Sequence, residues 1–242
     1  MRLLHLILLA MGLIAPGVIP GVSENAASPM IVQDSLQAAI NAGGTVYLKE
    51  GVYRQTMTID RSVNIIGMGS GRTVVDGDKK GSVFTIVKTN PNIDVKLSGM
   101  TIRGGKSEIG GGINNYGRLI VENSAITGNT AEFDGGTSNH NGTSTVTIAN
   151  VDITGNSAAH DDAGIYNSVG TLIINSGNIT GNNAEVDAGV FNDLGKVILK
   201  DGNITRNTAT QRCGGILNDG FMDFERGSVV KNTRGNVYNV SP

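Results

Sequence analysis

Apolar residues recur at a regular spacing through the second half of the chain. The segments VENSAITGN, IANVDITGN, INSGNITGN, LKDGNITRN and FERGSVVKN align without gaps. Their shared apolar position, extended one repeat upstream, is held by Ile102, Ile126, Ile153, Ile179, Ile204 and Val229, at intervals of 24 to 27 residues. A repeat of this length indicates a solenoid, in which each unit buries its apolar side against its neighbours.

The residues before each of these anchors alternate as in a β-strand. Seven positions upstream the residues are Val95, Leu119, Val146, Leu172, Val197 and Met222. Five positions upstream they are Leu97, Val121, Ile148, Ile174, Leu199 and Phe224. Both columns are apolar throughout, while the position between them is mixed, so each repeat contains a strand with one buried face.

A second phrase follows each anchor and has its own apolar column. It reads GGINN, GGTSN, AGIYN, AGVFN, GGILN and GNVYN. The apolar column consists of Ile113, Thr137, Ile165, Val190, Ile216 and Val237. Gly, Asn and Asp, which favour tight turns, separate these pieces. Each repeat therefore contains three short strands.

These features predict an all-β fold, a single-stranded right-handed parallel β-helix of about eight coils over residues 45–242. The repeat is too short for a propeller blade, which needs roughly 40 residues or more. The repeats also lack the L-x-x-L-x-L pattern of leucine-rich repeats. Stacked coils bury the apolar edge that a single coil cannot bury.

The N-terminal region predicts a signal peptide followed by a cap. Arg2, the apolar run at 3–15 and the small residues near 21–23 follow the order of a secretory signal. We expect residues 1–23 to be this signal, with an uncleaved anchor as the alternative, and the protein to be secreted or held in the cell envelope. No later stretch suggests a transmembrane span. Residues 24–44 are expected to form a linker and a short capping helix.

Within that cap, Asp34 is the expected N-cap and Gly43 the C-terminal stop. Leu36 and Ile40 would then cover the open end of the first coil. The sequence indicates no comparable cap after the last coil. We therefore expect a partner or self-association at the C-terminal edge.

Asparagine recurs at two positions of the repeat. One column consists of Asn115, Asn139, Asn167, Asn192 and Asn218, and the other of Asn129, Asn156, Asn182, Asn207 and Asn232. An amide can donate to the next coil and accept from the previous one, so both columns are expected to be structural ladders. A binding stripe lined by asparagine is the alternative.

Composition narrows the range of functions. The formal net charge is -2 and no basic stripe is visible, so nucleic acid is not an expected partner. Cys213 is the only cysteine, which excludes an intrachain disulfide. We expect it to be a packed turn residue, with a reactive thiol as the alternative.

The opening coils, GGTVYLKEGVYRQTMTIDRSVNIIGMGSGRTVVDG at 43–77, resemble those of the pectin-lyase-like β-helix superfamily. The later AGIYN and ITGN phrases resemble the short repeats of bacterial and archaeal surface proteins and of polymorphic outer-membrane proteins. The resemblance implies the fold. It leaves the function open, because that superfamily includes pectate lyases, polygalacturonases, epimerases and adhesins.

One set of residues suggests chemistry. The residue before each Gly-Gly or Ala-Gly pair is Asp134, Asp162, Asp187 and then Cys213, with Asp161 and Arg212 beside them. The resemblance to the pectin-lyase-like superfamily allows a uronate lyase, in which acidic groups hold Ca²⁺ and a neighbouring Arg or Lys removes a sugar proton. Asp162 and Asp187 are the candidate calcium ligands. Alternatively, Asp before Gly simply caps a turn. No other cofactor or metal is expected.

Two functions therefore remain. The favoured one is a non-enzymatic surface rod with a structural or adhesive role, which binds an extracellular glycan or an envelope protein. The alternative is a polysaccharide-active enzyme, either a calcium-dependent uronate lyase or an epimerase. Tyr166, Phe191 and Leu217 share an outward position and are expected either to form an apolar stripe for a partner or to pack under a loop. The polar segment 137–145 departs most from the repeat; simple drift of the repeat is the favoured interpretation, and a binding loop is the alternative.

Overall fold

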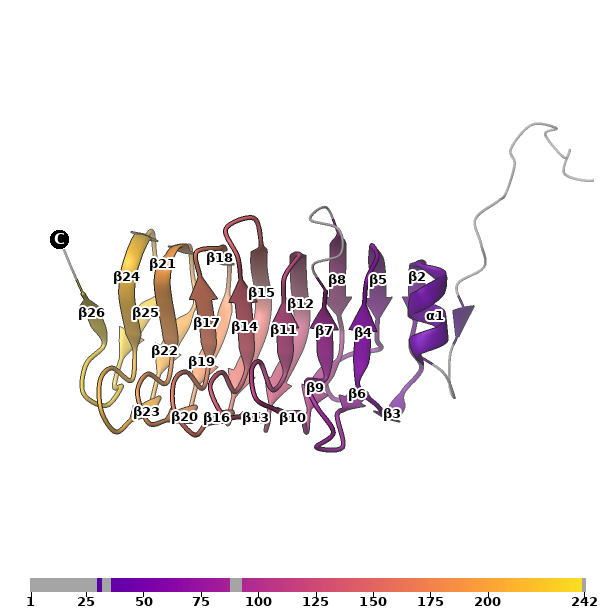
Figure 1. Cartoon of the computed structure of the whole chain (residues 1–242), viewed down its shortest axis with the longest axis horizontal. Coiled ribbons are helices and arrows are strands. Elements are labelled where there is room, and N and C mark those ends of the chain that lie inside the picture. Colours follow the sequence, from indigo (N-terminus) through magenta and orange to yellow (C-terminus); the bar gives the residue numbers. More distant parts are fainter. Residues whose placement is uncertain (1–29, 32–35, 88–92, 241–242) are drawn as a thin grey trace, which may run out of the picture.

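The computed structural model describes residues 30–31, 36–87 and 93–240, which form a parallel β-solenoid of about seven turns. Strands of neighbouring turns pair in parallel, as β12 (Arg118–Thr127) does with β15 (Thr145–Thr154). Figure 1 shows these turns stacked into a rod along the long axis of the molecule. The predicted β-helix is confirmed, with close to the expected number of coils.

Three long faces run along the rod. Face A contains β2 (Gly44–Tyr47), β5 (Val63–Ile66), β8 (Asp94–Ser98), the first halves of β12 and β15, β18 (Thr171–Ile174), and the second halves of β21 (Val190–Leu199) and β24 (Ile216–Phe224). Face B contains β3 (Gly51–Arg54), β6 (Thr73–Asp76), β9 (Thr101–Arg103), the second halves of β12 and β15, β19 (Gly177–Thr180), β22 (Asn203–Thr205) and β25 (Ser228–Val230).

Face C contains β4 (Met57–Ile59), β7 (Phe84–Ile86), β11 (Ile113–Asn115), β14 (Thr137–His140), β17 (Ile165–Ser168), the first halves of β21 and β24, and β26 (Val237–Asn239). Between faces B and C runs a short sheet of β10 (Lys106–Ser107), β13 (Thr130–Ala131), β16 (Ser157–Ala158), β20 (Asn183–Ala184) and β23 (Thr208–Ala209). The strands of face C lie nearest the viewer in Figure 1.

The register of the sheets follows the sequence repeat. Leu119 pairs with Val95 on one side and with Val146 on the other. The anchor Ile126 likewise pairs with Ile102 and Ile153. Each apolar column of the repeat is thus one inward-facing column of the solenoid, because residues two apart in a strand point to the same side.

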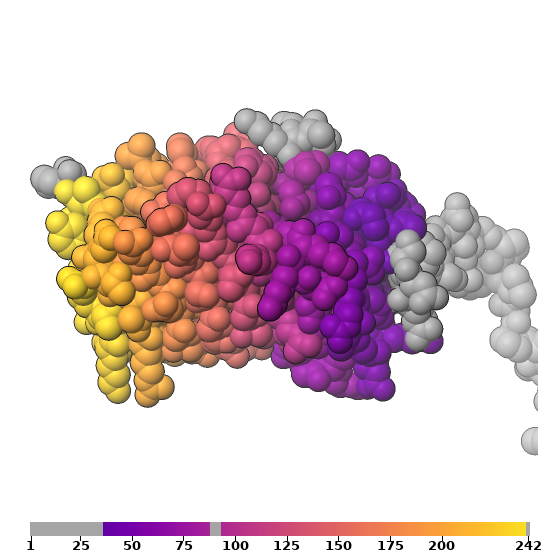
Figure 2. All heavy atoms as spheres, turned by 60° about the horizontal axis from the view of Figure 1, so that its bottom comes forward, coloured from indigo at the N-terminus to yellow at the C-terminus, as the bar shows by residue number. Residues whose placement is uncertain are grey.

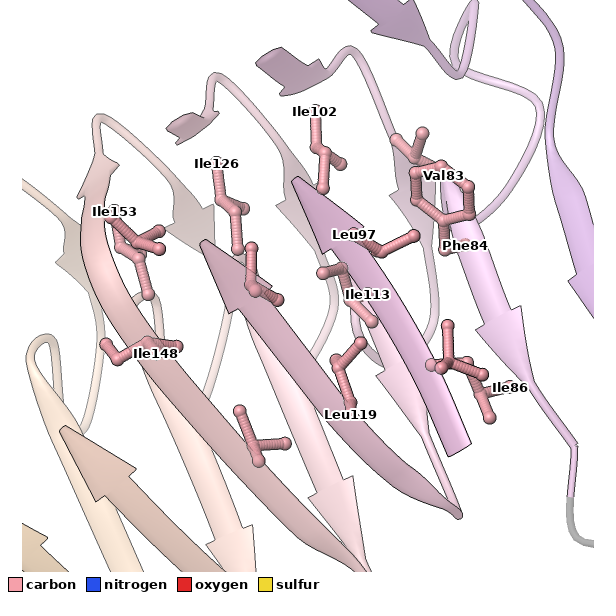
Figure 3. Close-up of a cluster of buried hydrophobic side chains, with 14 of the residues drawn as sticks. Val83, Phe84, Ile86, Leu97, Ile102, Ile113, Leu119, Ile126, Ile148 and Ile153 are labelled. Atoms are coloured by element: carbon pink, nitrogen blue, oxygen red, sulfur yellow. The ribbon is translucent and has the colours of Figure 1, made fainter. Parts of the chain in front are cut away.

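The core is the stack of these inward columns. Figure 3 shows aliphatic side chains from successive turns lying in rows inside the coil, among them Ile102, Ile126 and Ile153. All three are at most 1% exposed. Burying one such side chain contributes about 1.5–3 kcal/mol before the entropy cost of ordering the chain. Each turn is stabilised mainly by its two neighbours.

Helix α1 (Leu36–Ala42) covers the N-terminal end of this core. Leu36 and Ile40 are fully buried, as predicted. Gly43 ends the helix with φ of 75° and donates its N–H to the Ile40 carbonyl at 2.9 Å. Gln37 fixes the helix to β4 by donating to the Thr58 carbonyl and accepting from the Thr58 N–H.

Some of the remaining N-terminal features lie within the described residues and others lie outside them. A short strand, β1 (Met30–Ile31), adds to the edge of β2. The predicted signal peptide at 1–23 and the predicted N-cap Asp34 lie outside the described residues. Within the described ranges, no helix has the length and apolar character needed to cross a membrane.

Both asparagine columns form hydrogen-bonded ladders inside the solenoid. Asn139 donates its Nδ2 to Asn167 Oδ1 at 2.7 Å, and Asn167 donates to Asn192 Oδ1 at 2.8 Å. In the second column Asn156 donates in the same way to Asn182 Oδ1 at 3.1 Å. Its backbone N–H donates to the same oxygen at 3.0 Å. The turns are therefore joined by side-chain amides as well as by the backbone.

The last turn exposes positions that are buried elsewhere. Leu199 and Ile216 are fully buried, whereas Phe224 and Val237, one turn further along the same columns, are 45% and 41% exposed. Residues 221–224 of β24 and all of β25 pair on one side only within the described chain. Within the described residues this apolar edge is uncovered, and self-association there stays a prediction.

Removing one rung of an asparagine ladder should destabilise the solenoid. Asn167→Ala would remove the Oδ1 to which the Asn139 amide donates at 2.7 Å and the amide that donates to Asn192 Oδ1, both of them buried contacts. We expect a loss of about 2–3 kcal/mol of unfolding free energy, because orphaned buried polar groups cost about 1–3 kcal/mol. Urea unfolding followed by circular dichroism would measure it.

Asn203→Ala is the matched control, since Asn203 is exposed and donates only to Asn178 on the outer surface of face B. It should change the unfolding free energy by less than about 0.5 kcal/mol. Equal losses in the two variants would contradict the structural role of the buried ladder.

Candidate functional site

Three aspartates lie in register at the bend between the short sheet and face C. Asp134, Asp162 and Asp187 form successive parallel backbone bridges, and Cys213 continues the series. We call the three acids the aspartate column. Neighbouring turns are about 4.8 Å apart, so each acid has another directly above or below it.

The glycines that follow these acids allow the turns to approach closely. A Cβ at Gly136 or Gly164 would overlap the carbonyl oxygen of the equivalent glycine in the next turn. Only glycine fits at a position where another backbone comes so near. The Asp-Gly-Gly and Asp-Ala-Gly phrases therefore have a packing role, whatever else the acids do.

Burial raises the pKa of all three carboxyl groups. Desolvation raises the pKa of Asp134 to about 7 and that of Asp187 to about 6. It also raises the pKa of Asp162 well above its ordinary value, and the neighbouring carboxylates of Asp134 and Asp187 add to this. Like charges this close resist joint ionisation. The column thus retains protons near neutral pH.

Asp162 is the least satisfied member of the column. It is 1% exposed, and neither carboxylate oxygen has a hydrogen-bond partner within the described residues. One oxygen of Asp187 is also unpartnered there, while the other accepts the Cys213 N–H at 3.0 Å. Protonation relieves the cost of burying such an oxygen as a charge.

Asp161 and Arg212 lie at the outer side of the column. Asp161 is half-buried and raises the pKa of Asp134, Asp162 and Asp187 by repulsion. Arg212 is exposed and lowers the pKa of Asp162 and Asp187 by attraction. Its guanidinium carbon lies 6.0 Å from the centre of the Phe191 ring. Asp162 and Asp187 are therefore close to the predicted base Arg212.

A hydrogen-bond chain connects the column to the surface. Ser138 is fully buried and donates its hydroxyl to Asp134 Oδ2 at 2.8 Å. The same hydroxyl lies 2.6 Å from Nε2 of His140. The serine is thus the middle member of the chain. This order differs from a nucleophilic triad, in which histidine stands between serine and acid.

His140 belongs to a row of rings on the outside of face C. Its ring centre lies 4.8 Å from that of Tyr116, in a stacked pair, and 5.9 Å from that of Tyr166 in an edge-on pair. Tyr166 lies 5.6 Å from Phe191 in a tilted pair. We call Tyr116, His140, Tyr166 and Phe191 the aromatic row. All four are partly exposed.

Polar groups accompany the row. The Tyr166 hydroxyl donates to Asp193 Oδ2 at 2.8 Å. Burial raises the pKa of the Tyr166 hydroxyl, so it remains a donor at neutral pH. Burial likewise lowers the pKa of His140 and favours its neutral form. Leu217, expected beside Tyr166 and Phe191, is fully buried and adds nothing to the surface.

A separate shallow hollow of about 680 Å³ lies along the short sheet. Part of its wall is the turn at 77–82, which projects downward in Figure 1, and Figure 2 brings that side of the molecule forward. Lys79, Lys106 and His160 are among its lining residues. The aspartate column does not line it, so the buried acids are not at the bottom of this hollow.

Metal chemistry receives no geometric support from the described ranges. No group of three His, Cys, Asp or Glu side chains there is placed to hold an ion. The proposal that Asp162 and Asp187 bind calcium stays a prediction. Cys213 is 1% exposed, and burial raises the pKa of its thiol. Reactive cysteines are accessible and have a lowered pKa, so this one has the character of a packing residue.

Comparisons with protein-family models, with curated protein sequences and with solved structures found no match to this chain. The function must therefore be inferred from the residues themselves.

Sequence reasoning identified part of this arrangement. It aligned the three acids with Cys213, and it placed Tyr166 and Phe191 on one outward column. It did not connect Ser138 and His140 to Asp134, or Tyr116 to His140. The available signal was the phrase TSNH, where polar residues interrupt the repeat one strand after an aspartate.

Stability should fall as the pH rises, because protonated carboxyls favour folding here. A carboxyl whose pKa is higher folded than unfolded contributes fully below its unfolded pKa of about 3.9. The contribution is lost as the pH passes the folded values, about 6 for Asp187 and about 7 for Asp134. We expect Asp162→Asn to melt a few degrees above wild type near pH 8 and level with it near pH 4.

Asp223→Asn is the control, since Asp223 is exposed at the outer surface of face A. Its melting temperature should follow wild type at both pH values. A melting temperature for Asp162→Asn that is lower than wild type by the same amount at both pH values would contradict the raised pKa of Asp162 as a source of instability at high pH.

Proposed function

We propose that this chain is a secreted or cell-surface solenoid with a structural or adhesive role, which binds a glycan along face C. The observation that carries the proposal is the aromatic row, which is continuous over four successive turns. With about 4.8 Å between turns, the row extends about 15 Å along the rod. It offers a ligand an elongated surface.

The chemistry of the row suits carbohydrate. Sugar rings have apolar C–H faces that pack on aromatic side chains, and hydroxyls that need hydrogen-bond partners. The rings of the row are inclined to one another by 23°, 65° and 44°, so they offer both faces and edges. Asp193 beside Tyr166 and Arg212 beside Phe191 supply polar contacts at its border.

The resemblance of 43–77 to pectin-lyase-like proteins, and of the later phrases to surface repeat proteins, is consistent with this proposal. We infer a place among such extracellular β-helix proteins from these phrases, with the signal-like segment 1–23 supporting secretion. The rod would hold its ligand-binding face at a set distance from its attachment.

A catalytic function is the second candidate, and one observation favours it. Asp134 has a pKa of about 7 and is connected through Ser138 to the partly exposed His140. Groups tuned in this way can move protons, as a uronate lyase or epimerase requires. Against it, Asp162 and Asp187 are 1% exposed and cannot touch a substrate in this arrangement.

Glycan binding should depend on the row. Tyr166→Ala removes the ring that contacts both His140 and Phe191. Loss of one aromatic contact should weaken binding about tenfold, measured by calorimetry with ligands found on a glycan array. Tyr47→Ala is the control, because Tyr47 is 41% exposed on another face. Equal affinity of the two variants would remove the row from the binding surface.

A turnover screen separates binding from catalysis. We expect the protein to leave uronate polysaccharides unchanged, with calcium and with chelator, as followed by new reducing ends and unsaturated products. Turnover that requires calcium and disappears in Asp162→Asn would instead establish the enzyme and place its metal on the aspartate column.

A further inference from the structure

We propose that Asp134, Ser138 and His140 form a proton relay that allows acidic glycans to bind the aromatic row only when Asp134 is protonated. The inference rests on the proposed glycan-binding function and specifies its ligand class and its control. It starts from two contacts, the 2.8 Å bond from Ser138 to Asp134 and the 2.6 Å approach of Ser138 to His140 Nε2.

When Asp134 is ionised, it sets the direction of the hydrogen bonds from His140 through Ser138. A carboxylate can only accept, so the Ser138 hydroxyl must donate to it. The serine oxygen then accepts, and the proton of neutral His140 must be on Nε2. Nδ1 has no hydrogen-bond partner among the described residues, and in this state it presents a lone pair. A ligand carboxylate, which is also an acceptor only, is repelled there.

Protonation of Asp134 reverses the chain. Nδ1 of the partly exposed His140 ring takes a proton from water, Nε2 passes its proton to the Ser138 oxygen, and the serine passes its own proton to Asp134. The new carboxyl O–H then donates to the Ser138 oxygen, and the serine hydroxyl donates to His140 Nε2. The histidine keeps its charge and changes tautomer. Nδ1 now donates, and a carboxylate of the ligand becomes a suitable partner.

Other charges around the relay act in the same direction. Asp134 is faced by Asp161 and Asp162 of the next turn, and its charge also acts on Tyr166. Ionised acids here repel an acidic sugar, and protonation removes that repulsion. His140 is flanked by the uncharged rings of Tyr116 and Tyr166.

Arg212 provides the attraction that selects acidic glycans. Its side chain is exposed, and it has no ion-pair partner within the described chain. It lies against Phe191 at the end of the row. A guanidinium binds carboxylates with two parallel hydrogen bonds, which suits a uronate. Once the column is neutral, its charges no longer oppose this cation, and the carboxylates that remain near the row are those of Asp161 and Asp193.

The protonation of Asp134 falls in an experimentally accessible pH range. The pKa of Asp134 is about 7, and that of His140 is lowered by burial. The relay therefore switches before the imidazole itself becomes charged. Further acidification adds a second proton to the ring and leaves Nδ1 a donor. A uronate carboxyl, with a pKa of about 3.5, stays ionised throughout.

The relay can be tested first without ligand. In ¹⁵N NMR spectra of the histidine-labelled protein, the proton of His140 should move from Nε2 to Nδ1 as the pH falls from about 8 to about 6. In Ser138→Ala, which breaks the chain and keeps Asp134, the tautomer should no longer follow the acid. An unchanged tautomer in wild type would overturn the relay, whatever the protein binds.

The gate is tested with oligogalacturonate and a neutral galacto-oligosaccharide of equal length, titrated by calorimetry. Wild type should bind oligogalacturonate about tenfold more tightly near pH 5.5 than near pH 8, and the neutral sugar equally at both. Asp134→Asn should keep the tighter affinity at both pH values. Asp152→Asn, an exposed acid on face B, should behave as wild type.

The outcomes separate the two proposals. Oligogalacturonate affinity that is independent of pH, or a Ser138→Ala variant with the full wild-type pH response, would overturn the gate. A tautomer that switches while neither sugar binds at any pH would contradict the proposed glycan-binding function and leave the relay in place.

Discussion

The parallel stacking of turns is the constraint on which the rest of this structure depends. Backbone hydrogen bonds set the turns about 4.8 Å apart, so every inward side chain lies directly on its counterpart in the next turn. Apolar columns satisfy this arrangement by packing, as Ile126 does between Ile102 and Ile153. Polar residues satisfy it only if the same group can both donate and accept. Asparagine can do so, which explains why its ladders tolerate full burial, as at Asn167.

Aspartate at a similar position cannot satisfy itself. Stacked carboxylates have acceptors on both sides and no donor, so Asp134 and Asp187 raise the pKa of Asp162 between them, and both Asp162 oxygens lack a partner among the described residues. The same stacking that stabilises the asparagine ladders thus raises the pKa of carboxyl groups a few residues away. Ser138 and His140 carry the influence of this column outward to the aromatic row. The residues of the site therefore depart from the repeat, but the stacking of the repeat brings them together.

The sequence alone was sufficient for the fold, because the solenoid translates each repeat position into one column. The pairings of Leu119 and Ile126, and the burial of Leu36 and Ile40 in the cap, all follow from spacing. The site was less accessible to such reasoning. Ser138 reaches Asp134 through side-chain orientation inside one turn, and His140 lies between two tyrosines from the turns on either side. Periodicity identifies columns but does not determine rotamers, and hydrogen bonds depend on rotamers.

The asparagine ladders also give the rod an electrical direction. In the column that contains Asn139 each side-chain amide donates toward the following turn, as Asn139 does to Asn167, whereas the amides of the other column also donate back to a carbonyl of the preceding turn. The amide dipoles of the Asn139 column are therefore aligned head to tail, and such chains polarise one another in a medium of low dielectric constant. Backbone strands contribute little of this kind, since their dipoles nearly cancel. The solenoid consequently resembles a very long helix in one respect, with partial positive charge at its last turn and partial negative charge at its first.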